Sequence, residues 1–222
     1  MLARHFLSLL FPELIFSVRT TEKKIYLTFD DGPTPEVTPW VLDVLKQYNA
    51  PATFFCVGCN VEKNPALLSE IITAGHSIGN HTMHHLSGWG TSSATYLEDV
   101  RQCDEVLFHL QQQTTNNKQQ TNFFRPPYGR ITPSQYSSLK KKYRIVMWDL
   151  LSRDFDKNIS GEKCLQRVIT KSKPGSIVVF HDSVKAEKNL RYVLPRALEY
   201  FSENGFLFYS MIRDETLIAA LI

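Results

Sequence analysis

The sequence predicts an α/β fold in which helices wrap a parallel sheet that closes into a barrel. Strand-like and helix-like segments alternate along all 222 residues, without a repeat of fixed period. Several expected strands are unbroken apolar runs, which is typical of strands buried on both faces. Polar residues recur where these strands end, as at the catalytic edge of such barrels. We count about seven strands, one fewer than the usual eight of this class.

The strands are recognised as short apolar runs between turn or helix signals. The first run, I-Y-L-T-F at residues 25–29, carries no charge and ends at Asp30 and Asp31. The second run, A-T-F-F-C-V at residues 52–57, has the same character. In chain order, the expected strands lie at residues 25–29, 52–57, 77–80, 123–124, 144–148, 176–180 and 206–209.

The helices between them are recognised from apolar residues at helical spacing and from cap residues. Asn64 and Pro65 open one helix as a cap and a first-turn proline, and Gly75 closes it. The polar, low-complexity run at residues 111–122 is expected to be a mobile surface loop. The expected helices lie at residues 36–48, 64–75, 96–112, 133–143, 161–172 and 187–204, with a short C-terminal helix after them.

We expect residues 1–23 to be an N-terminal extension and residues 24–222 to be a single catalytic domain. Pro12 and Glu13 interrupt the apolar residues of the extension, which is shorter than the roughly 20 apolar residues of a spanning helix. No clear signal peptide is seen. A cytoplasmic location, or one peripheral to the inner face of the membrane, is therefore favoured, and the extension either touches a membrane surface or packs on the domain.

Charge and cysteine content exclude several functions. A formal net charge of +3 is too small to indicate binding to nucleic acid. Cys56 and Cys59 form a C-x-x-C pair, but no second pair completes a zinc site. With four cysteines in all, free thiols are expected rather than a disulfide scaffold.

The polar residues that follow the strands are expected to share one rim of the barrel. The adjacent carboxylates Asp30 and Asp31 precede Gly32 and Pro33, and on their own could be only turn residues. Later strand ends add, in chain order, His81, His84, His85, Arg125, Tyr128, Asp149, Asp154, His181 and Asp182.

His81 and His85 stand four residues apart, which would bring both imidazoles to one side of a helical turn. Two imidazoles and one carboxylate would make a three-ligand metal site with an open position for water. A chance pair of surface histidines is the alternative.

Taken in order, the motifs T-F-D-D-G-P, H-T-x-x-H, R-x-P-Y and a strand ending in histidine resemble the polysaccharide deacetylase family. This family is also called the NodB-homology domain, or carbohydrate esterase family four. The resemblance covers residues 24 to about 209. It implies a single-domain distorted (β/α)7 barrel. It also implies a metal-dependent hydrolase that removes N-acetyl, or O-acetyl, groups from an acetylated sugar or polysaccharide and releases acetate.

The resemblance also implies a role for each site residue. Asp31, His81 and His85 would bind the metal, most readily zinc, although cobalt, nickel or iron suit the same ligands. Asp30 would be the general base and His181 the general acid. Arg125 would be the charge partner of Asp30, Tyr128 would offer its backbone N–H to the oxyanion, and Asp154 would be the carboxylate beside the acid. The walls of the substrate pocket would be formed by Phe29, Pro126, Val179 and Phe155.

The fourth motif departs from the family pattern D-x-x-D-W, because Leu151 and Phe155 replace its first aspartate and its tryptophan. This departure keeps two alternatives open, a metal-dependent hydrolase of a non-sugar amide and an inactive carbohydrate-binding relative. Asp154 is expected to hydrogen bond to His181, with Asp149 as the competitor. His84 is expected to face solvent.

Overall fold

The computed structural model describes residues 11–114 and 122–211. These residues form a parallel sheet in the order β5-β4-β3-β2-β1-β7-β6, and β8 pairs with the start of β1. The strands are β1 (Lys24–Asp30), β2 (Thr53–Cys56), β3 (Ser77–Asn80), β4 (Phe123–Phe124), β5 (Arg144–Ile145), β6 (Leu150–Leu151), β7 (Ile177–His181) and β8 (Leu207–Phe208). The predicted α/β class and parallel sheet are confirmed.

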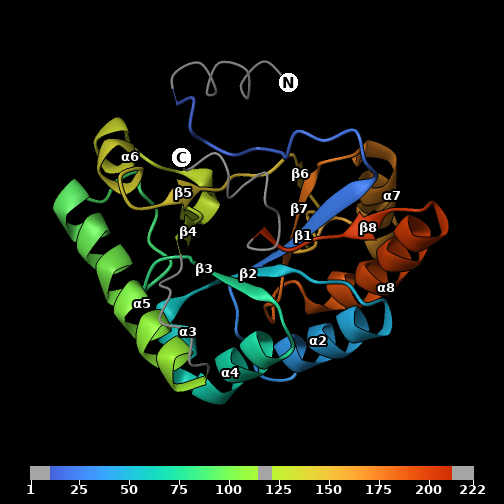
Figure 1. The fold of residues 1–222 in the computed structure, drawn as a ribbon, viewed down its shortest axis with the longest axis horizontal. Helices are drawn as coiled ribbons and strands as arrows, with labels where there is room; N and C mark the ends of the chain where they lie inside the picture. The colour runs from blue at the N-terminus through green and yellow to red at the C-terminus, as the bar shows by residue number, and fades with distance from the viewer. Residues whose placement is uncertain (1–10, 115–121, 212–222) are drawn as a thin grey trace.

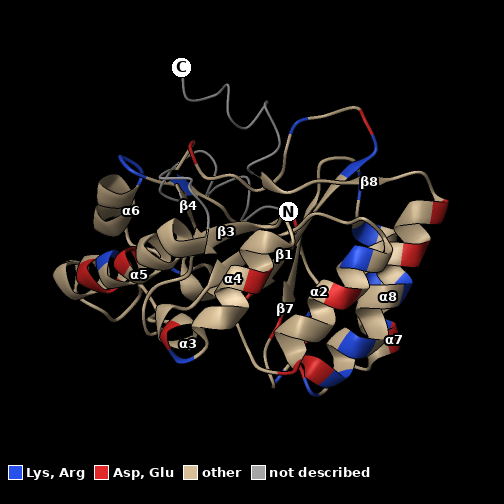
Figure 2. Cartoon of the chain, turned by 60° about the horizontal axis from the view of Figure 1, so that its bottom comes forward, with Lys and Arg blue, Asp and Glu red and all other residues tan. Residues whose placement is uncertain are grey.

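Helices line the outside of the curled sheet, from α6 and α5 on one side, through α3, α4 and α2, to α8 and α7 on the other (Figure 1). Charged residues of both signs alternate along α7 and α8, as expected for helices with one solvated face (Figure 2). The helices are α2 (Val37–Gln47), α3 (Gly58–Lys63), α4 (Pro65–Thr73), α5 (Ser93–Thr114), α6 (Pro133–Leu139), α7 (Gly161–Lys171) and α8 (Glu187–Glu203), with the short 3₁₀ helix η1 (Pro127–Gly129).

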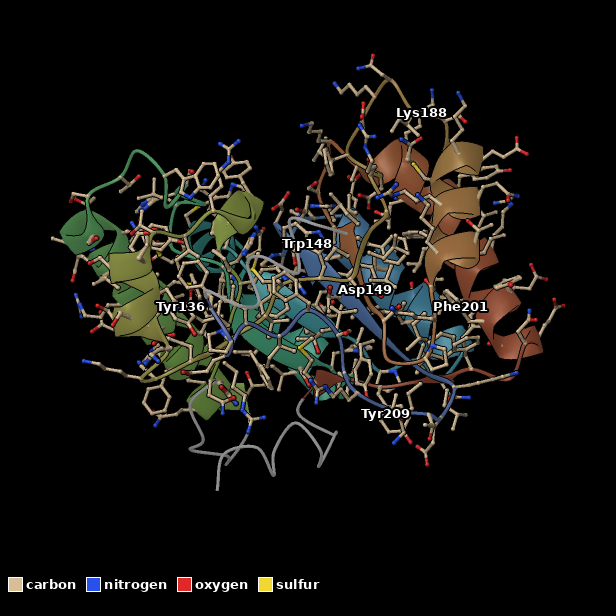
Figure 3. The ribbon with its side chains drawn as sticks, turned by 90° about the horizontal axis from the view of Figure 1, so that it is seen from above. Tyr136, Trp148, Asp149, Lys188, Phe201 and Tyr209 are labelled. Atoms are coloured by element: carbon tan, nitrogen blue, oxygen red, sulfur yellow. The ribbon has the colours of Figure 1, made fainter. Side chains whose placement is uncertain are left out.

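The barrel is distorted because its sheet stays open between β5 and β6. Within the described residues, no backbone pairing joins these two strands, so the predicted closure is not made by the sheet itself. Trp148 and Asp149, in the connection from β5 to β6, lie between Tyr136 on α6 and Phe201 on α8 (Figure 3). The curled half-barrel thus agrees with the expected distorted barrel, with a gap in the sheet between β5 and β6.

The amino-terminal segment, residues 11–18, lies across this open side (Figure 1). Ile15 pairs with Val146 beyond the end of β5, and Ser17 pairs with Ser176 before β7. Leu14 and Val18 are buried. Of the two expectations for the predicted extension, packing on the domain is therefore the one that holds for this segment; residues 1–10 lie outside the described part of the chain.

The strand β1 separates two cores. Ile25, Leu27 and Phe29 belong to the large apolar cluster beneath the helices, whereas Tyr26 belongs to a cluster on the other face. Phe29 stacks on Phe54 and Phe180, with ring centroids 4.9 and 5.8 Å apart. The prediction that Phe29 lines the substrate pocket is wrong, because side chains alternate along a strand and Phe29 takes the face opposite to Asp30.

Several element boundaries differ from those predicted. α5 continues through residue 114, so the first part of the loop predicted at residues 111–122 is helical, and residues 115–121 lie outside the description. The predicted strand at 144–148 is reduced to β5. α3 and β6 were not predicted. The predicted C-terminal helix also lies outside the described residues. Among the helices of the described residues, none is long and apolar enough to cross a membrane.

Candidate active site

Asp30 ends β1 beside a buried cation. Its Oδ1 accepts a hydrogen bond of 2.6 Å from Arg125, and both side chains are almost fully buried. The Arg125 guanidinium also donates to Thr28 Oγ1 and to the carbonyls of Val146 and Met147. It lies 4.1 Å from the centre of the Phe55 ring. Every side of this guanidinium is engaged, so it holds the Asp30 carboxylate in one position.

Asp31 turns away from Arg125 and meets two histidines. Its Oδ1 lies 3.1 Å from His85 Nε2 and 3.7 Å from His81 Nε2. The ligand atoms of all three residues lie within 4.8 Å of one another. Asp31 has a φ of 78°, which rotates its side chain away from that of Asp30, and Asn60 Nδ2 holds its carbonyl. The structure therefore brings together the three residues predicted as metal ligands.

The protonation states of Asp31 and His81 suit a divalent metal. His81 Nδ1 must donate to the Arg125 carbonyl, 2.7 Å away, because a carbonyl only accepts, and this leaves the Nε2 lone pair facing Asp31. Burial outweighs the nearby carboxylates and lowers the pKa of His81 to about 4, so the ring is neutral. Burial raises the pKa of Asp31, but the hydrogen bond with His85 and the charges of the neighbouring histidines outweigh burial and lower the pKa to about 2. One carboxylate and a neutral imidazole are the required ligand states.

The segment between the two histidine ligands is a tight loop and not the helical turn that was predicted. Thr82 and His85 both have left-handed backbone angles, with φ of 66° and 55°. Asp99 on α5 binds the loop, since its Oδ2 accepts from the backbone N–H groups of Met83 and His84. His84 Nδ1 lies 2.6 Å from Asp99 Oδ1 while its side chain is 57% exposed. His84 thus faces solvent as expected, and Asp99 is a loop-shaping residue that the spacing did not reveal.

His181 ends β7 at the register position of Asp30 on the neighbouring strand. Its Nδ1 lies 2.7 Å from Asp154 Oδ1, and its backbone N–H donates to Asp154 Oδ2. Asp149 instead accepts from Ser176 Oγ. Burial lowers the pKa of His181, but the charge and hydrogen bond of Asp154 outweigh it and raise the pKa to about 9. The partner is therefore Asp154 and not the competitor.

The predicted pocket residues other than Phe29 lie around this centre. Val179 is fully buried and precedes His181 by two residues, so both share one face of β7. The half-buried ring of Phe155 meets the edge of His181, with centroids 4.9 Å apart. Tyr128, with φ of 59°, meets His85 at 4.7 Å and is 61% exposed. Pro126 is buried beside Arg125 in the chain.

Asp182 is a buried carboxylate that the sequence argument did not assign. Its Oδ1 accepts from the Gly32 N–H at 3.1 Å, and Thr38 Oγ1 donates to its Oδ2 at 2.6 Å. Burial raises the pKa of Asp182 to about 8. A Cβ atom on Gly32 would come within 2.0 Å of this carboxyl group. Asp182 thus clamps the turn that carries Asp31, and its place directly after His181 was the available signal.

The chain matches a known family. The sequence model described as polysaccharide deacetylase matches residues 17–145. The chain is 33% identical over 198 residues to a peptidoglycan-N-acetylglucosamine deacetylase of Bacillus cereus, covering 88% of this chain and 90% of the relative. It is 33% identical to a chitooligosaccharide deacetylase of Bradyrhizobium, covering 72% and 71%.

A solved structure agrees with these sequence matches. The Bc1960 peptidoglycan N-acetylglucosamine deacetylase superposes with a TM-score of 0.82 at 31% identity, covering 90% of this chain and 91% of that one. Family model, sequence relatives and solved structure agree over most of the chain, so this chain belongs to the polysaccharide deacetylase family.

Proposed function

We propose that this protein removes N-acetyl groups from a carbohydrate that contains N-acetylglucosamine, using a divalent metal, with zinc as our choice. The observation that carries the proposal is the convergence of one triad and two pairs of side chains at one sheet edge. These are the ligand triad of Asp31, His81 and His85, the Asp30–Arg125 pair and the His181–Asp154 pair. The products are acetate and a free sugar amine.

Asp30 acts as the general base in this proposal. A metal on the triad would polarise the amide carbonyl and make water more acidic when it is bound. Asp30 takes a proton from the attacking water, and the Arg125 cation 2.6 Å away holds its carboxylate in position. The Tyr128 backbone N–H would donate to the oxyanion. A base of this kind contributes roughly 10²–10⁴-fold to the rate.

His181 acts as the general acid. A sugar amine leaves readily only after it has gained a proton, so the acid must be protonated at neutral pH. The hydrogen bond to Asp154 consumes Nδ1–H, which directs Nε2–H toward the site. Asp30 and His181 occupy one register position on the neighbouring strands β1 and β7, so the base and the acid end at the same edge of the sheet and can both reach the scissile amide.

The names of the relatives support this substrate class. Their names specify peptidoglycan N-acetylglucosamine and chitooligosaccharides, and both carry an N-acetyl group on a glucosamine unit. The chain spans most of the length of both relatives, so this activity is proposed for the chain as a whole.

Acetate release tests the proposal. Protein stripped with a chelator should release no acetate from N-acetylglucosamine oligomers, and added zinc should restore the reaction. Asp30→Asn should keep its metal yet lose turnover by about 100-fold or more. Simple acetamides serve as the control substrates. Faster hydrolysis of those amides than of the sugars would contradict the carbohydrate assignment, and full activity in the stripped protein would contradict the role of the metal.

A further inference from the structure

Trp89 is an indole presented to solvent. Its side chain is 61% exposed, the same fraction as that of Tyr128 beside His85. Apolar side chains that are exposed singly are ordinary on protein surfaces, so the case for Trp89 rests on the groups that it contacts. Neither the metal site nor the acid–base pairs use Trp89.

One cation and one ring, Arg130 and Tyr128, connect Trp89 to the triad of Asp31, His81 and His85. The Arg130 guanidinium lies 5.2 Å from the centre of the Trp89 ring and 5.7 Å from the centre of the Tyr128 ring. Tyr128 in turn meets His85, one of the triad residues, at 4.7 Å. Trp89 therefore stands at the outer end of a row of contacting groups that begins at His85.

The loop that carries Trp89 is rigidly held. Gln135 is fully buried, and its Nε2 donates to the carbonyls of Gly88 and Thr91 on either side of the indole. Trp89 Nε1 donates to the Ile131 carbonyl at 3.4 Å. A Cβ atom on Gly88 would come within 2.4 Å of the Arg130 carbonyl, so the loop packs tightly on this neighbouring segment. An exposed ring that is fixed before binding loses little entropy when a ligand arrives.

Arg130 is free to take part in binding. No described carboxylate lies within ion-pair distance of its guanidinium, so its charge is not neutralised by this part of the chain. Its guanidinium carries five N–H donors in a planar fork. Sugar hydroxyl and ring oxygens are acceptors for such donors, and the C–H face of a pyranose is an apolar surface that fits an indole.

We propose that Trp89 and Arg130 form an accessory subsite for a sugar unit beyond the one that carries the reacting N-acetyl group. This inference rests on the proposed deacetylase function and makes the substrate an oligosaccharide rather than a single sugar. The distal sugar stacks on the indole of Trp89 and accepts hydrogen bonds from Arg130. The subsite adds affinity for longer chains and leaves the chemistry to Asp30 and His181.

Substrate length provides the test. Trp89→Ala should raise KM for the N-acetylglucosamine tetramer by about tenfold, while kcat on the tetramer and kcat/KM on the monomer stay within about twofold. Trp89→Phe should restore most of the loss, since a ring remains. Leu207→Ala is the matched control, because Leu207 is also 61% exposed but pairs with the start of β1, at the end opposite to Asp30.

Calorimetry of tetramer binding to zinc-loaded Asp30→Asn protein separates this inference from the deacetylase proposal. Adding Trp89→Ala to that variant should weaken binding about tenfold. If the wild-type protein releases no acetate but this loss is seen, the deacetylase function is wrong and the subsite stands. Unchanged tetramer affinity and KM in Trp89→Ala would overturn the subsite, as would an equal loss of activity on tetramer and monomer.

Discussion

Two neighbouring aspartates are given different tasks by their partners. Asp30 faces a buried guanidinium, whereas Asp31, one residue later, faces two imidazoles. The left-handed backbone at Asp31 makes this division, since an extended residue could not bring its carboxylate to the same edge. Identical side chains at adjacent positions thereby have different surroundings, which suit the proposed base at Asp30 and the proposed metal ligand at Asp31.

The high-pH limb of the pH–rate profile, where the general acid His181 loses its proton, should depend on Asp154. The pKa of His181 is raised to about 9, so the acid is protonated at neutral pH and its contribution is lost as pH rises toward that value. In Asp154→Asn the carboxylate that raises the pKa of His181 is gone, so burial lowers this pKa and the high-pH limb should move toward acidic pH. A bound metal shifts the limbs of both proteins in one direction, so their difference is the quantity to measure.

Asp149→Asn is the control for this pH–rate experiment. Asp149 accepts from Ser176 and not from His181, so its variant should keep the wild-type limb. A limb that moves in Asp149→Asn and not in Asp154→Asn would contradict the assignment.

Metal retention should distinguish two histidines that lie in the same loop. His81→Ala removes a buried nitrogen that faces Asp31, and we expect loss of bound metal. His84→Ala removes a largely exposed ring whose contact is Asp99, and the metal should remain. Metal content per protein, measured by atomic emission after gel filtration, decides the point. Equal retention in the two variants would remove His81 from the ligand set.

At the scale of elements, alternation and apolar runs were sufficient to predict most strands and their parallel orientation. α3 and β6 escaped because six and two residues are too few to show a period. Phe29 was misplaced because a strand buried on both faces gives no polar side from which to orient it. Asp31, His81 and His85 could be named in advance only through ordered motifs, since spacing alone suggested a helical turn that the loop does not form.

Gly175 shows how tightly one turn fits its neighbour. It has φ of 81°, and a Cβ atom there would lie 1.9 Å from the Val18 carbonyl oxygen. Gly175→Ala should therefore lower the free energy of unfolding by more than the roughly 1–2 kcal/mol cost of a left-handed alanine alone. Gly205→Ala, with φ of 72° and open space around it, should show only that backbone cost. Equal losses in urea unfolding would indicate that the Val18 contact is dispensable.

The whole molecule should become more stable when a metal joins β1 to the loop after β3. A ligand that binds only the folded state adds about 2.7 kcal/mol to the free energy of unfolding at a concentration 100 times its Kd. Zinc should therefore raise the melting temperature of the wild-type protein and leave that of His81→Ala almost unchanged. A similar rise in the two proteins would place the stabilising metal elsewhere.

The amino-terminal segment affects whether the open edges of the sheet can pair with other copies of this chain. Residues 14–18 occupy backbone groups beside β5 and before β7 that would otherwise be unpaired at the rim of an open sheet. Such edges are templates on which strands of other molecules add. A chain trimmed to begin at Lys24 would keep every group of the reaction centre, yet it would expose these edges, and we expect it to self-associate during refolding.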